Sequence, residues 1–164
     1  MNATLFKTKL KLFLEARTSK SPEQTADAFG KAYDDANKSL AFTMFGNKLI
    51  SGNKDKLISY LKSGFEKNQN IKKTSNEIEE GWIQIARGFI WYWDDAKFQD
   101  APPAPGVSPK PNAVSVLPPN MWADREKLAR KIKLCFTEGS AKLNADSLVS
   151  VLNEMHKNIK GRLS

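Results

Sequence analysis

Histidine and cysteine, which often carry acid–base, nucleophilic or metal chemistry, each occur once in the 164 residues, as His156 and Cys135. A lone histidine cannot form a histidine-based metal cluster, and a lone cysteine excludes a thiolate cluster and an intrachain disulfide. We expect His156 to lie on the surface beside Lys157. We expect Cys135 to pack in the core, because it falls on an apolar helical stripe.

Paired carboxylates are a second possible source of chemistry, since a general acid and a general base can act together. Adjacent acids occur at Asp34-Asp35, Glu79-Glu80 and Asp94-Asp95. Neighbouring residues on a helix point about 100° apart, so the two members of such a pair do not aim at one spot. The sequence also has no glycine-rich phosphate loop, no G-x-S-x-G and no H-E-x-x-H motif. It predicts a protein that is not an enzyme and that uses no cofactor or metal ion.

Basic and aromatic clusters make nucleic-acid binding an alternative function. Lysine and arginine contact phosphates, and aromatic rings stack on bases. Asp94 and Asp95 adjoin the aromatic residues, which is a poor design for a phosphate-lined groove. The net charge of +8 is spread along the chain, as expected for a solvated basic surface. The aromatic cluster is Trp91, Tyr92 and Trp93, and the basic face is Arg125, Lys127, Arg130, Lys131 and Lys133.

Apolar periodicity and capping residues predict five or six helices. Ser21-Pro22-Glu23-Gln24 is the clearest start, because it combines an N-cap serine, a proline at the first helical position and a capping-box glutamine. Alternation of Leu10, Leu12 and Leu14 makes a strand the alternative to the first helix. Gly81 and Gly88 lie on one face of the fourth helix and indicate a close helix crossing. The expected helices cover residues 3–17, 22–40, 54–67, 75–95, 121–136 and 145–159.

The stretch from Gly88 to Asn120 interrupts these helices, because it holds seven of the eight prolines. Proline lacks an amide donor and fixes φ, so no helix or central strand runs through such a density. We therefore predict an all-α fold with one long proline-rich extended crossing that has room for a short strand. The expected parts are a helical body (1–98), the crossing (99–120) and a C-terminal helical pair (121–164), packed as a single domain. The crossing wraps either its own body or a neighbouring subunit.

Residues 112–117 are the part of the crossing that suits a strand, since Val114 and Val116 are β-branched. A lone strand leaves its backbone groups unpaired, which is costly when they are buried. Residues 48–50 and 10–14 are candidate partners, but we expect the partner strand to come from another subunit by edge addition. We also expect Trp91 and Trp93 to pack against the prolines. The predicted interface is Trp91, Tyr92, Trp93, Val114, Val116 and Leu117.

The order of these features resembles small virion structural proteins encoded among the tail, baseplate and neck genes of contractile-tailed bacteriophages. The resemblance covers roughly residues 21–160. It is carried by the S-P-E-Q helix, the helix end GFIWYW, the segment APPAPGVSPKPNAVSVLPPN and the final LVSVLNEMHK. It implies a structural protein in repeated copies that contacts other virion proteins and itself, and it carries over no catalytic residues. The expected location is the virion, after synthesis in the host cytoplasm, with no secretory signal and no contact with a membrane.

Overall fold

The computed structural model describes residues 1–15, 20–39, 48–69, 75–98, 114–117, 121–136 and 143–163. Within them the chain forms six α-helices and four short strands, so the predicted, mostly helical fold is confirmed. The helices are α1 (Ala3–Leu14), α2 (Pro22–Lys38), α3 (Lys54–Gln69), α4 (Ser75–Trp91), α5 (Met121–Cys135) and α6 (Ala145–His156). The strands are β1 (Leu49–Ser51), β2 (Ala96–Phe98), β3 (Val114–Leu117) and β4 (Lys160–Leu163).

Local hydrogen bonds explain where the helices begin. The predicted capping box is present: Ser21 Oγ accepts from the Gln24 amide at 3.1 Å, and Gln24 Oε1 accepts from the Ser21 amide at 3.0 Å. The side chain of Asn2 accepts from the Leu5 amide and that of Asn144 from the Ser147 amide. Each of these bonds satisfies an amide that the first turn leaves without a partner. Because residues 10–14 belong to α1, the alternative of a strand there is wrong.

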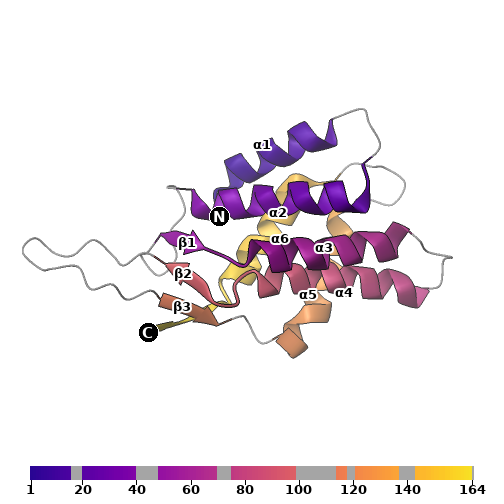
Figure 1. Cartoon of the computed structure of the whole chain (residues 1–164). Coiled ribbons are helices and arrows are strands. Elements are labelled where there is room, and N and C mark those ends of the chain that lie inside the picture. Colours follow the sequence, from indigo (N-terminus) through magenta and orange to yellow (C-terminus); the bar gives the residue numbers. More distant parts are fainter. Residues whose placement is uncertain are drawn as a thin grey trace, which may run out of the picture.

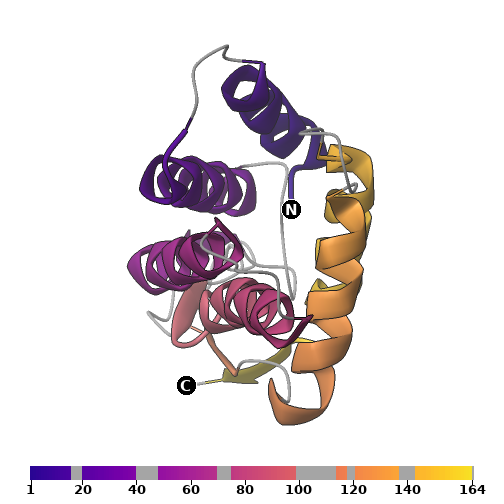
Figure 2. The ribbon, with the colours of Figure 1, turned by 90° about the vertical axis from the view of Figure 1, so that its right-hand side faces the viewer.

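The first four helices form a stack, with α5 running across one side of it (Figures 1 and 2). The strands lie together at one end of the helical body (Figure 1). One cluster of buried apolar side chains joins all six helices, from Phe6 on α1 to Leu152 on α6. The core therefore includes residues from both sides of the proline-rich crossing.

Helix α3 crosses α4 closely at glycine residues, as the positions of Gly81 and Gly88 predict. A Cβ on Gly64 of α3 would lie 2.7 Å from the Gly81 carbonyl oxygen, and a Cβ on Gly88 would lie 3.1 Å from the Leu57 carbonyl oxygen. Contacts this close to a backbone atom leave little room for any larger residue. Glycine is thus required by the helix crossing rather than by a turn.

The strands form one antiparallel sheet in the order β1-β2-β3-β4. The strand predicted within residues 112–117 exists as β3, but its partners come from this chain, so the expected pairing with another subunit is wrong. Val116 is paired with Ala96 of β2 on one side and with Gly161 of β4 on the other. Both edges of β3 are therefore occupied.

The chain reverses immediately after α4, which explains how β2 reaches β3. Asp95 has a φ of 58°, a left-handed conformation that aspartate tolerates better than most residues. Register then places Phe98 of β2 opposite Val114 of β3. The two ends of the connection 99–113 thus lie side by side, while the connection itself, including any wrapping of a body or neighbour, lies outside the described residues.

Candidate interaction surface

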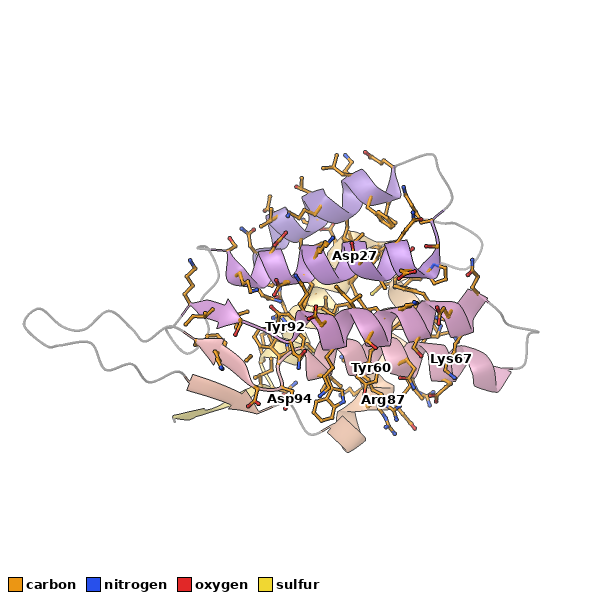
Figure 3. All side chains as sticks on the ribbon, viewed as in Figure 1. Asp27, Tyr60, Lys67, Arg87, Tyr92 and Asp94 are labelled. Carbon is orange, nitrogen blue, oxygen red and sulfur yellow. The ribbon has the colours of Figure 1, made fainter. Side chains whose placement is uncertain are left out.

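Two of the predicted interface residues are buried inside this chain. The side chains of Tyr92 and Trp93 are 0% exposed, so their assignment to an interface is wrong. The physical reason is that both residues begin the turn after α4, where their rings pack against Tyr33 of α2 in the core (Tyr92 is labelled in Figure 3). Trp91 keeps part of its surface, and Lys56 Nζ lies 4.0 Å from its ring centroid. The expected packing of Trp91 and Trp93 against the prolines involves residues outside the described part of the chain.

His156 is also buried, contrary to the expected surface position. It is 8% exposed, and its Nε2 lies 2.6 Å from the Tyr33 hydroxyl oxygen. The same oxygen accepts a hydrogen bond of 3.0 Å from Trp93 Nε1. Because the indole can only donate, the Tyr33 O–H remains available to donate to His156 Nε2. The three side chains therefore connect α2, the turn after α4 and α6.

Burial determines the protonation states in this group. It lowers the pKa of His156 to about 3, with a further contribution from the positive charge of the amino terminus. It also raises the pKa of Tyr33 well above its ordinary value, against the smaller effect of the hydrogen bond from Trp93. A neutral imidazole and a protonated phenol match the donor and acceptor roles above.

Asp34 forms the second part of this group. Its Oδ1 accepts from the Tyr92 hydroxyl at 2.8 Å, and its Oδ2 accepts from Lys38 Nζ at 2.9 Å. Burial, and then the charge of Asp34, raises the pKa of Tyr92 above its ordinary value. The neighbouring Asp35 instead pairs with Lys9, so these adjacent acids do not converge. We call Tyr33, Asp34, Tyr92, Trp93 and His156 the buried polar cluster.

All five members of the buried polar cluster are shielded from solvent, and each is at most 8% exposed. Hydrogen bonds within the cluster connect α2 with α6 and with the segment after α4. Asn37, one turn beyond Tyr33, is also fully buried, and it acts on the Tyr33 hydroxyl group from the same helix. We conclude that this cluster stabilises the helical body.

Cys135 packs in the core, as the apolar stripe predicts. It is 2% exposed, and its Sγ donates to the Lys131 carbonyl oxygen at 3.3 Å. Burial raises the pKa of its thiol above the ordinary value. A buried, protonated thiol is a poor nucleophile.

The residues of the predicted basic face differ in their exposure to solvent along α5. Lys127 and Arg130 are exposed, whereas Arg125, Lys131 and Lys133 are half-buried. Lys131 donates to both carboxylate oxygens of Glu154 on α6, at 2.7 and 2.6 Å. The remaining predicted interface residues, Val114, Val116 and Leu117, have β3 positions, but their side chains lie outside the description.

A groove of about 60 Å³ lies between α5 and α6, above α4. Its apolar floor and most of its polar rim come from α4, α5 and α6, of which α5 and α6 are consecutive in the chain. We call it the α5–α6 groove. The floor is Ile90, Leu128, Val151 and Met155, and the rim is Lys127, Lys131, Glu154 and Asn158.

Sequence reasoning found one side of this groove and missed the other. Lys127 and Lys131 belong to the basic run and are four residues apart, so they share a helix face. Nothing in the local pattern of α6 marks Val151 or Glu154 as their neighbours. The helical stripe of α6 is the available signal, but it cannot specify which helix packs against it.

Exposed leucines add apolar surface elsewhere on the helical body. Leu134 is 80% exposed on α5, one turn beyond Arg130, and Leu12 is 70% exposed on α1. Large apolar side chains that are exposed singly are common in proteins, and neither leucine lines the α5–α6 groove. Leu134 lies on α5, the helix that also carries Lys127 and Lys131 of the groove rim.

Within the described ranges, no helix is long and apolar enough to span a membrane. The same part of the chain contains no group of three or more histidine, cysteine or acidic residues placed to hold a metal ion. Comparison with protein-family models, curated proteins and solved structures finds no match to this chain.

Proposed function

We propose that this chain is a structural protein of a contractile-tailed bacteriophage virion, acting through protein–protein contacts in the tail, baseplate or neck region. One observation supports a role in binding rather than in catalysis. The residues with the most perturbed pKa values, Tyr33, Tyr92 and His156, are enclosed in the core. The surface instead offers an apolar groove with a lysine rim and exposed leucines.

Assembly and location test this proposal. Light scattering should give a mass well above the 18.4 kDa of one chain, and it should rise with concentration toward a fixed stoichiometry. Antibodies against the purified chain should label the tail, baseplate or neck of particles from the phage that encodes it. A monomer at every concentration, together with unlabelled particles, would contradict the proposal.

Nucleic-acid binding is the second candidate, favoured by the exposed Lys127 and Arg130. It loses support from the burial of Tyr92 and Trp93, which cannot stack on bases from within the core. Affinity for a duplex oligonucleotide that falls steeply with salt would favour this candidate, because phosphate contacts release counterions. Weak binding without such a salt dependence would exclude it.

A further inference from the structure

We propose that the α5–α6 groove binds a protein segment in which an apolar side chain is flanked by acidic residues. This inference rests on the proposed function, because it names the chemistry of the protein partner. The groove provides two kinds of recognition at one place. Its floor accepts an aliphatic group, and its rim carries cationic groups that attract carboxylates.

The floor favours an aliphatic anchor. Ile90, Leu128 and Met155 are buried beneath the groove, and Val151 lines it with part of its surface exposed. The volume of about 60 Å³ exceeds the space that a single water needs. An apolar side chain placed there would remove the exposed part of Val151 from water, which is favourable in proportion to the area buried.

The rim has more positive than negative charge. Glu154 is paired with Lys131, while Lys127 and Lys157 also act on its charge and help to lower its pKa. Three lysines therefore surround one carboxylate. Lys127 and Lys157 are both exposed, and the described residues provide no ion pair for either. A partner carboxylate near Lys127 or Lys157 would meet complementary charge.

The same features favour a peptide over a nucleic acid. A peptide can bury one apolar side chain on the floor while its carboxylates remain near the lysines at the edge. A nucleic acid presents phosphates at a regular spacing, so it cannot place its charges only near the lysines and away from the Glu154 carboxylate, as a peptide can. Its bases would also need an aromatic platform, whereas the floor is aliphatic.

A short acetylated peptide with glutamates around a central leucine is the probe. Titrated into the full ¹⁵N-labelled chain, it should shift the amide signals of α5 and α6. Replacing its leucine by serine, or its glutamates by glutamines, should each weaken binding by about tenfold or more, the change expected for a loss of roughly 1.4 kcal/mol. Equal binding of all three peptides would overturn the inference.

Two substitutions in the protein localise the effect. Lys127→Glu should weaken peptide binding by about tenfold, since like charges across an interface are repulsive. Lys67→Glu is the matched control, because Lys67 is an exposed helical lysine on α3 that does not line the groove. Val151→Tyr should occlude the groove and block binding, with its amide spectrum checking that the fold is retained. Equal weakening by Lys67→Glu and Lys127→Glu would show nonspecific attraction and contradict the inference.

The remaining outcomes separate this inference from the proposed function. Peptide binding at the groove without labelling of phage particles would leave the inference standing and remove the proposed function. Labelled particles without peptide binding would support the proposed function and contradict the inference. Amide shifts in α5 and α6 caused by a duplex oligonucleotide, with none from the peptide, would identify a nucleic-acid contact and overturn the inference.

Discussion

The buried polar cluster and the rim of the α5–α6 groove both consist of polar side chains, but the cluster is buried and the rim faces solvent. In the cluster, Tyr33 contacts both Trp93 and His156, and Asp34 accepts from both Tyr92 and Lys38. In the groove, Glu154 and Lys131 form a partly exposed ion pair, and the neighbouring Lys127 is exposed to solvent.

The difference shows how burial changes the role of a polar group. A buried group that loses water must find a partner in the protein, so the cluster stabilises one arrangement of helices. An exposed ion pair contributes little to stability and exchanges readily with solvent or a ligand. Substitutions in the cluster should therefore change folding, whereas substitutions in the groove should change binding.

Trp93→Ala should have the largest effect. The ring is fully buried against Tyr33, Tyr92 and His156, and emptying such a site costs about 3–5 kcal/mol of unfolding free energy. Denaturant unfolding followed by circular dichroism measures it. The control is Trp91→Ala, which should cost less because Trp91 is partly exposed. An unchanged midpoint for Trp93→Ala would show that the ring is not packed as described.

Tyr33→Phe should have the next largest effect. It keeps the ring but removes the hydroxyl that contacts both Trp93 and His156, and disrupting a buried hydrogen bond costs about 1–3 kcal/mol. Tyr60→Phe on α3 is the matched control, because Tyr60 is half-buried (Figure 3) and lies outside the cluster. If the two variants unfold at the same denaturant concentration, the hydroxyl of Tyr33 adds nothing to stability.

Acid should weaken the folded state through His156. Its pKa is about 3 in the folded chain and near 6.5 in an unfolded one, so only the unfolded state binds this proton between those values. Stability from this residue is complete above pH 6.5 and falls by up to about 1.4 kcal/mol for each pH unit below it. His156→Gln should flatten the pH dependence between pH 6 and about 4.5, above the range in which most carboxylates titrate. Equal slopes for the two proteins would place the imidazole in solvent.

Reversing both Lys127 and Lys131 to glutamate should have the smallest effect on folding. Exposed and partly exposed ion pairs contribute about 0–1 kcal/mol, so the monomer should keep nearly its original midpoint. Association measured by light scattering should nevertheless weaken, because the groove loses its cationic rim. Intact assembly of the doubly substituted chain would mean that these lysines form only a solvated face.

The sequence by itself determined the helices, because the interactions that begin and end them act within about four residues. Ser21 and Gln24 cap one another, Asn144 caps α6, and the glycine face of α4 predicts a close crossing. The placement of Cys135 on an apolar stripe also follows from local spacing. Such short-range signals are visible without knowing what lies elsewhere in the chain.

Only the tertiary structure decided the pairing of the strands, the cluster and the groove. β2 and β4 are short and contain lysine, so their own residues give little indication of a sheet, which forms because β3 pairs with both. His156 is buried because it meets Tyr33, 123 positions away, and the lysines of α5 gain a groove because α6 packs beside them. These features depend on contacts between distant residues, and a local pattern can show that a helix has an apolar face without showing which residues will cover it.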